Sequence, residues 1–436
     1  MRQVFALRAM GTTASREVVA GATTFLTMAY IIFVNPQILS ATGMDRGALV
    51  TVTILATAFG TLLAALWANV PFAMAPGMGL NAMFTYTLVL GEGLAWQTAL
   101  GVVFISGLAF LLLTVLGVRE RVVNAIPLSL RLGVAAGIGL FITFIGCQQL
   151  GLVQAHEETL VTLGEITPLV LVGLAGLALI AVLEVRRVPG SLLIGILFTS
   201  VLAWLLVPDT APTGLVSLPP SPAPIALELD IGAALQWGLL GAIFSFMFVD
   251  LFDSVGSIMA CSYEAGLVRE DGTVRKIDRV LKADAVATLA GALLGTSTTT
   301  TYIESGAGIA AGGRTGLTSV VTAGLFLAAL FFTPLAVAVP AVATAPALIV
   351  VGVYMFRNIR RIDFSDLGEG IPAFLTIILM PFTYSISLGI AFGFLSYIVL
   401  AVAAGRWRRV SPVLWIIGAL SAAELALRGS ALLGGG

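Results

Sequence analysis

The sequence is poor in charged residues, cysteine and histidine. Asp, Glu, Lys and Arg make up 10% of the 436 residues and hydrophobic residues make up 58%, with a mean hydropathy of +1.05. Soluble globular domains carry about 25% charged residues, so this composition excludes a soluble globule and favours a polytopic membrane protein. The two cysteines, Cys147 and Cys261, are too few to indicate a disulfide framework.

The motifs of enzymes and nucleotide-binding proteins are also absent from the sequence. There is no HExxH motif and no Cys/His cluster, and the single His156 has no partner at metal-ligand spacing. The glycine-rich segment 310–316 lacks the Lys-Ser/Thr ending of a phosphate-binding loop. We therefore expect no catalytic residues, no metal site and no cofactor. The basic loop 269–282 fits attraction to anionic lipid and not nucleic-acid binding.

Long apolar runs follow one another with short loops between them. Because roughly 20 apolar residues span a bilayer as a helix, these runs predict an all-α membrane protein with fourteen spans. The runs cover residues 17–40, 47–69, 72–90, 95–117, 127–152, 166–184, 190–207, 235–261, 280–295, 297–312, 315–338, 343–356, 371–386 and 388–405. A further apolar stretch, 412–427, either lies along the membrane interface or dips into it.

The distribution of positive charge predicts the orientation, because Lys and Arg concentrate in cytoplasmic loops. With the N-terminus inside, the loops after even-numbered runs and the segment after the last run are cytoplasmic and hold Arg119, Arg121, Arg186, Arg187, Arg269, Arg275, Lys276, Arg279, Lys282, Arg314, Arg357, Arg360, Arg361, Arg406, Arg408 and Arg409. The outside loops carry Glu157, Glu158 and Glu165, and Arg46 is the exception to the pattern. We expect a protein of the cell membrane with both termini in the cytoplasm.

The third and tenth runs contain interruptions that disfavour a continuous helix. Pro76, Gly77 and Gly79 interrupt the third run, and the threonine run 298–301 favours extended backbone in the tenth. Each is third in a half of seven runs, and since seven is odd, the halves have opposite topology. Interrupted segments in corresponding positions of inverted repeats point to a transporter's binding site.

Three acids stand out within these apolar runs. Asp250 and Asp253 belong to the eighth run and Glu304 to the tenth, and acids within spans usually mark substrate or proton pathways. A carboxylate accepts N–H donors from a ligand, and we expect no Lys or Arg deep in a run to attract an anion. For each acid, the alternative to a functional role is a structural hydrogen bond that ties helices together. For Asp250 two roles are open: it braces the interrupted segment, or it touches the ligand. A shift of 223 residues between the halves pairs polar residues with these acids: Thr27 with Asp250, Tyr30 with Asp253, and Asn81 with Glu304.

Four separated motifs carry a family resemblance. FVDLFDSVGS, TSTTTTYIESGAGIAAGGRTGLT, APGMGLNAMF and EGIPAFLTIILMPFTYSI resemble the signatures of AzgA-like purine permeases, within the nucleobase-cation symporter (xanthine/uracil permease) superfamily. The resemblance runs from Gly21 to about Ala404. It implies two inverted repeats of seven spans that form a core and a gate. The core comprises 1–126 (spans 1–4) and 230–338 (spans 8–11), the gate comprises 127–229 (spans 5–7) and 339–405 (spans 12–14), and 406–436 forms a C-terminal interfacial segment.

The resemblance also implies the substrate and the roles of site residues. It implies import of adenine, guanine or hypoxanthine with protons, the coupling ion being H⁺. Asp253 matches the eighth-span acid that holds the base and Glu304 the tenth-span glutamate; both acids and Asp250 are candidates for proton coupling or for bracing the site. The remaining substrate-binding candidates are Tyr302, which lies beside Glu304, and Asn81, which matches the third-span amide. An equal alternative for Asn81 is a hydrogen bond to unwound backbone. Thr27 and Tyr30 are candidates by their first-span position.

Several alternatives to a proton-coupled purine carrier stay open on the sequence. They are an anion carrier of the sulfate or bicarbonate type on the same architecture, a uracil or xanthine permease, and an intramembrane enzyme or channel. In the uracil and xanthine branches the eighth-span acid is Glu and the position four residues later is His or Asp, whereas this chain has Asp253 and Ser257. The expected partners are a purine base, protons and membrane lipid, with a homodimer through the gate left open and no nucleic acid.

Overall fold

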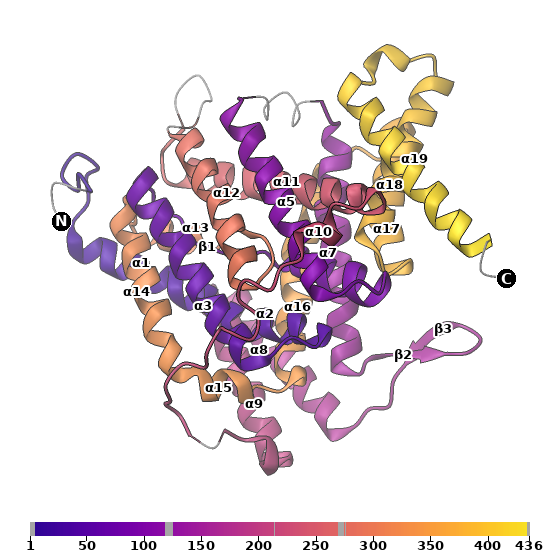
Figure 1. The fold of residues 1–436 in the computed structure, drawn as a ribbon. Helices are drawn as coiled ribbons and strands as arrows, with labels where there is room; N and C mark the ends of the chain where they lie inside the picture. Colours follow the sequence, from indigo (N-terminus) through magenta and orange to yellow (C-terminus); the bar gives the residue numbers. More distant parts are fainter. Residues whose placement is uncertain (1–4, 118–124, 213, 269–273, 275, 434–436) are drawn as a thin grey trace.

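The computed structural model describes residues 5–117, 125–212, 214–268, 274 and 276–433. Within these residues the protein is a bundle of helices with two small pairs of strands (Figure 1). Nine helical segments of the described chain are long and apolar enough to cross a membrane, and four further apolar helices are shorter. The protein is therefore a mostly helical, multi-pass membrane protein, while the count of fourteen spans stays a prediction. Four basic residues of the expected inside loops, Arg119, Arg121, Arg269 and Arg275, lie outside the described residues.

The elements follow the predicted runs closely. Those of the first half are α1 (Ala14–Met28), α2 (Ile31–Leu39), α3 (Arg46–Leu63), β1 (Met74–Pro76), α4 (Met78–Ala82), α5 (Trp96–Val115), α7 (Leu128–Leu150), β2 (Val153–His156), β3 (Leu160–Leu163), α8 (Pro168–Val185) and α9 (Ser191–Leu206). Those of the second half are α10 (Ile231–Ala234), α11 (Leu240–Glu264), α12 (Ile277–Leu294), β4 (Thr299–Thr301), α13 (Ser305–Ala310), α14 (Gly316–Ala329), α15 (Thr333–Ala338), α16 (Ala341–Phe356), α17 (Leu367–Phe382), α18 (Ile386–Ala403) and α19 (Pro412–Leu433).

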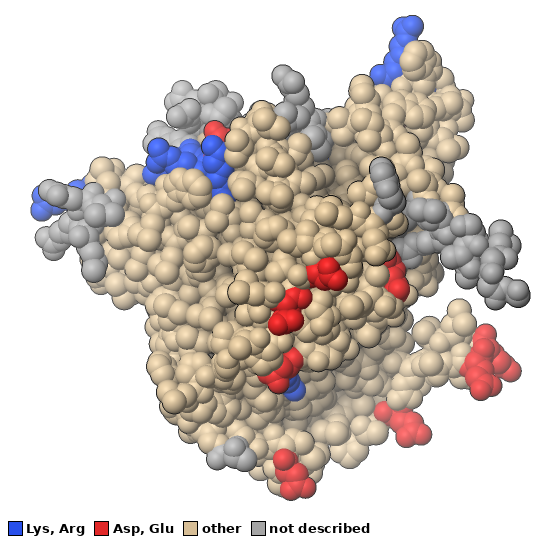
Figure 2. Space-filling model, in the orientation of Figure 1, with Lys and Arg blue, Asp and Glu red and all other residues tan. Residues whose placement is uncertain are grey.

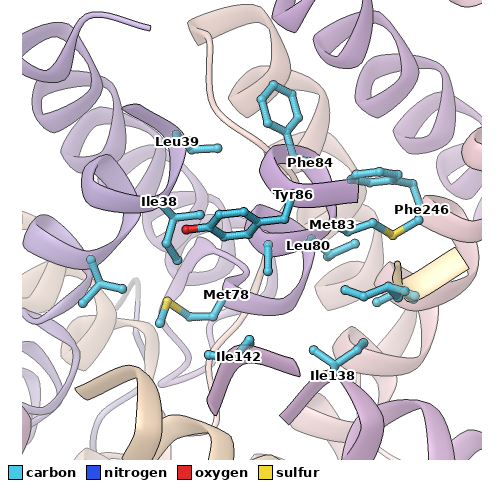
Figure 3. Close-up of a cluster of buried hydrophobic side chains, with 14 of the residues drawn as sticks. Ile38, Leu39, Met78, Leu80, Met83, Phe84, Tyr86, Ile138, Ile142 and Phe246 are labelled. Carbon is cyan, nitrogen blue, oxygen red and sulfur yellow. The ribbon is translucent and has the colours of Figure 1, made fainter. Parts of the chain in front are cut away.

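The helices pack in two groups. In one group α1 packs on α13 and α14, α3 on α12 and α14, and α5 on α11 and α12. In the other group α7 packs on α16 and α17, α8 on α9 and α16, and α17 on α18. Apolar side chains fill the region where the groups meet, as seen where Met78, Leu80 and Met83 face Ile138 and Ile142 of α7 (Figure 3).

The two interrupted segments meet as an antiparallel pair of strands. β1 pairs with β4 in the register Met74 to Thr301, Ala75 to Thr300 and Pro76 to Thr299. Extended backbone in these two segments is therefore confirmed. The two strands begin 225 residues apart (299 − 74), close to the shift of 223 residues between the halves, and the individual residue equivalences stay a prediction.

Charge on the visible surface is distributed unequally between the two ends of the helices. In Figure 2 most Lys and Arg side chains lie at the upper end, where α5 ends and α12 begins, and most Asp and Glu side chains lie lower down. This separation follows the loop pattern read from the sequence. It agrees with basic loops on the cytoplasmic side.

Candidate functional site

The strand pair β1–β4 lies close to the candidate site, and its backbone groups are hydrogen-bonded within the protein. Free N–H and C=O groups are costly at membrane depth, since lipid offers no partner. The Tyr302 amide donates to the Ala73 carbonyl at 2.9 Å, the Gly77 amide donates to the Thr298 carbonyl at 2.9 Å, and the Thr288 hydroxyl donates to the Thr299 carbonyl at 2.9 Å. These bonds hold the extended segments in place.

Asp253 lines a cavity of ≈ 380 Å³. It projects from α11, which runs unbroken for 25 residues past the strands. A Cβ added to Gly77 would lie 3.7 Å from the Asp253 carboxylate and 3.0 Å from the Thr300 methyl carbon. The acid therefore lies directly against the first interrupted segment, and glycine at position 77 provides the space for this approach.

Glu304 opens into a second cavity, of ≈ 500 Å³, at the start of α13. Ile303 and Tyr354 line both cavities, so the two spaces adjoin. The Asp253 and Glu304 carboxylates are close enough to interact electrostatically. The structure thus brings together the two acids that the sequence singled out most strongly.

Two first-span candidates contact Glu304. The Tyr30 hydroxyl donates to the Glu304 carboxylate at 2.8 Å, although Tyr30 is itself fully buried. Thr27 lines the Glu304 cavity, and its hydroxyl lies 3.5 Å from the Glu304 carbonyl oxygen. Tyr30 therefore orients the carboxylate, while Thr27 is the residue with direct access to the cavity.

Tyr302 and Asn81 are placed differently. The Tyr302 hydroxyl donates to the Pro76 carbonyl at 2.5 Å and thereby ties the two interrupted segments together. Asn81 is fully buried and its side-chain oxygen accepts a hydrogen bond from the Ser297 hydroxyl. Among the described residues the Asn81 amide nitrogen has no hydrogen-bond partner, and neither residue lines the two cavities. Their contact with substrate stays a prediction.

Asp250 belongs to a separate buried network behind β4. The Ser254 hydroxyl lies 3.4 Å from the Asp250 carboxylate and donates to the Asp284 carboxylate at 2.5 Å. Asp284 in turn accepts from the Thr301 amide at 2.9 Å and from the Thr301 hydroxyl at 3.1 Å. This geometry favours a bracing role for Asp250, and it shows that Asp284 holds strand β4 from α12.

Replacing Asp284 by alanine is expected to destabilise the fold. The change leaves the Thr301 amide and hydroxyl without their acceptor in a fully buried setting, at a cost of about 2–4 kcal/mol for the two donors. Thermal unfolding of the detergent-purified variant measures this loss, with Asp284→Asn as the matched control because it keeps one acceptor oxygen. Equal melting temperatures for the alanine variant and the wild type would contradict the assignment.

Sequence reasoning missed several residues that line the cavities. Arg131 on α7 and Arg361 line the Asp253 cavity, and Glu184 and Arg187 line the Glu304 cavity. Arg131 also lies over the Phe252 ring, 5.8 Å from its centre. The expectation of no Lys or Arg deep in an apolar run did not cover basic residues at the ends of the runs, and such residues line both cavities. These arginines lie at helix ends in the sequence, and it is the open shape of the cavities that brings them to the site.

A helical membrane bundle with two interrupted segments that cross, and with acids at the crossing, defines a membrane transport protein. The chain belongs to the Permease family, whose model matches residues 15–392. It is therefore a transporter and not an enzyme.

Individual relatives cover almost the whole chain. It is 45% identical to the adenine permease AdeP of Escherichia coli strain K12 over 96% of this chain and 94% of that protein. It is 43% identical to the guanine/hypoxanthine permease PbuG of Bacillus subtilis strain 168, over 95% and 97% of the two chains. Among solved structures it is similar in fold to the transmembrane domain of the cyanobacterial bicarbonate transporter BicA, with a TM-score of 0.63 and 16% identity over 89% and 97% of the chains.

Proposed function

We propose that the protein imports purine nucleobases by proton symport. The observation that carries the proposal is the position of Asp253 and Glu304, which face adjoining cavities at the crossing of β1 and β4. Purine bases carry ring and exocyclic N–H donors on their edges, and carboxylates are acceptors for such donors. Relatives named adenine permease and guanine/hypoxanthine permease, each more than 40% identical over nearly the whole length, support the same substrate class.

An anion carrier is the competing function that the fold allows. BicA transports bicarbonate by its name, but its 16% identity extends only to the fold. Two carboxylates near the strand pair repel an anion, and the arginines that line the cavities lie near helix ends. Asp253 and Ser257 likewise favour the purine branch over the uracil and xanthine branches.

The conformation supports alternating access between a core and a gate. We assign 1–126 and 230–338 to the core and 127–229 and 339–405 to the gate, a division that the two packing groups of helices support. Residues expected on the cytoplasmic side, Arg131, Arg187 and Arg361, line the cavities. We assign this arrangement to the inward-facing state, with the core moving against the gate to open outward. We also assign the C-terminal segment, which the structure describes to residue 433, to the membrane interface, and a homodimer would form through the gate.

An aromatic cluster on the opposite side closes the outer path. Tyr86 and Tyr384 pack edge to face with ring centres 5.7 Å apart, and Phe141 lies within 6.4 Å of Tyr86 and 5.3 Å of Tyr384. The Gln149 amide donates to the Tyr86 hydroxyl at 3.2 Å, and the Tyr384 hydroxyl donates to Gln148 at 3.0 Å. Because Tyr86 belongs to the core and the others to the gate, this contact has to open in the outward-facing state.

Replacing Tyr384 by leucine is expected to favour outer opening. An aromatic pair contributes about 0.5–1.5 kcal/mol, so the open population should rise roughly two- to tenfold. The measurement is the labelling rate of a cysteine at the buried Thr87 by a membrane-impermeant maleimide, in a background with Cys147 and Cys261 changed to serine. An unchanged labelling rate would contradict an outer closure at this cluster.

Transport itself is tested with the purified protein in liposomes. With an imposed pH gradient, acid outside and in sodium-free buffer, we expect accumulation of radiolabelled adenine, guanine or hypoxanthine that a protonophore abolishes. Labelled sulfate, bicarbonate and uracil serve as comparisons. Uptake of sulfate or bicarbonate without uptake of any purine would refute the proposed function. Purine uptake at the same rate with and without the pH gradient would refute the symport mechanism alone.

A further inference from the structure

The Glu304 cavity has a second polar wall that the purine-binding acids do not provide. Opposite Thr27 and Glu304, the lining comes from Glu184 at the inner end of α8, from Ser191 at the start of α9, and from Tyr354 of α16. All three belong to the helices assigned to the gate. The cavity thus lies between two carboxylates, that of Glu304 from the core and that of Glu184 from the gate.

Glu184 is held so that its carboxylate faces this space. The Ser191 hydroxyl donates a hydrogen bond to it, and Tyr354 interacts with it from α16. Glu184 also interacts electrostatically with Glu304 across the cavity. A carboxylate has about four lone-pair sites, so two protein donors leave acceptor capacity directed at the cavity. A brace between α8 and α9 needs Ser191 alone and does not account for Tyr354 or for the opposing acid.

The cavity suits a flat heterocycle with donors on opposite edges. Its volume of ≈ 500 Å³ lies within the range of small-molecule sites, about 300–1,000 Å³. A purine base can donate N–H groups to Glu304 from one edge and to Glu184 from another, while Tyr354 offers a ring for stacking. Arg187 lies at the solvent-exposed rim and marks the cytoplasmic side.

We propose that this cavity is a release station for the purine, in which Glu184 of the gate is a further substrate-binding residue that acts only in the inward-facing state. The proposal rests on the proposed function and extends it to a second position of the base. Because Glu184 belongs to the gate and Glu304 to the core, movement of the core separates the two acids. Glu184 therefore contributes to binding from the cytoplasm and not to binding from outside.

The test is the sidedness of substrate affinity in Glu184→Gln. Right-side-out and inside-out membrane vesicles from cells without other purine permeases give the KM for adenine or guanine at the outer and the inner face. We expect the ratio of inner to outer KM to rise about tenfold or more, because a neutral amide replaces a charged acceptor. Glutamine keeps an oxygen that accepts from Ser191, so the brace between α8 and α9 is preserved.

Glu369→Gln is the matched control. Glu369 also accepts a hydrogen bond from a serine, Ser129, at the inner end of a gate helix, but it lines neither cavity. Its ratio of KM values should equal that of the wild type. An unchanged ratio in Glu184→Gln, or an equal rise at both faces, would overturn the release station. Absence of purine transport by the wild type would instead refute the proposed function. If the Glu184→Gln variant does not reach the membrane, Tyr354→Phe replaces it in the test. This variant keeps the ring and should raise the ratio of inner to outer KM by a smaller factor.

Discussion

Replacing Asp253 or Glu304 by alanine is expected to reduce purine uptake at limiting substrate by about tenfold to more than a hundredfold. Each change removes a charged acceptor at the crossing of β1 and β4, and hydrogen bonds to charged groups contribute about 1.5–3 kcal/mol. The alanine variant of Glu304 also deprives the buried Tyr30 hydroxyl of its acceptor. The measurement is initial uptake of radiolabelled adenine and guanine by proteoliposomes that hold equal amounts of folded protein.

Ser257→Ala is the matched control for this prediction. Ser257 lies one helical turn beyond Asp253 on α11 and lines the same cavity. Its uptake should stay close to that of the wild type, because the hydroxyl contributes no charge. If both alanine variants of the acids keep wild-type uptake while inserting normally, the acids do not bind the base and the account of the site is wrong.

Replacing Glu17 by alanine is expected to destabilise the protein more than any other single change to an acid outside the cavities. Glu17 is fully buried, and its carboxylate accepts from the amides of Arg314, Thr315 and Thr318 and from the hydroxyls of Thr315 and Thr318. It therefore caps the first turn of α14 from α1. Loss of this acceptor leaves several buried donors unsatisfied, at a total cost of about 3–5 kcal/mol.

Thermal unfolding in detergent and the yield of monodisperse protein measure this effect. Glu17→Gln is the graded control, since it keeps one acceptor oxygen and should lose less stability than alanine. Glu165→Ala, in an exposed outer loop, should leave the melting temperature unchanged. A melting temperature for Glu17→Ala equal to that of Glu165→Ala would rule out the capping role.

Local signals in the sequence were sufficient to predict the architecture around the site. Pro76 and Gly77 interrupt one apolar run, the threonines before Tyr302 interrupt another, and both interruptions became the paired strands β1 and β4. Asp253 and Glu304 stood out because a carboxylate in an apolar run is costly. These predictions depended on chemistry within one segment, and such chemistry is visible in one sequence.

Residues whose role depends on a distant partner could not be found in the same way. Glu17 is the first residue of the first apolar run and reads as an ordinary acid at a helix start, although its partners lie about 300 residues later. Asp284 lies near the start of the apolar run 280–295, two residues after Lys282, and Glu184 ends the run 166–184 just before Arg186 and Arg187. Each is polar where polar residues are common at a membrane interface, so their burial appears only when the packing of the helices is known.

The equivalence of the two halves illustrates the same limit. A constant shift of 223 residues pairs Asn81 with Glu304, yet Glu304 lines a cavity and Asn81 does not. Asn81 bonds Ser297, the residue two positions before β4, and not the cavity. A constant shift along the sequence therefore does not say whether two paired side chains have the same surroundings.

The most direct test of the account is an experimental structure of the protein with a purine base bound. The account predicts that the base lies at the crossing of β1 and β4, in one of the two adjoining cavities, with its N–H groups within hydrogen-bond distance of Asp253 or Glu304. A base bound elsewhere, with both carboxylates hydrogen-bonded to protein groups alone, would contradict it.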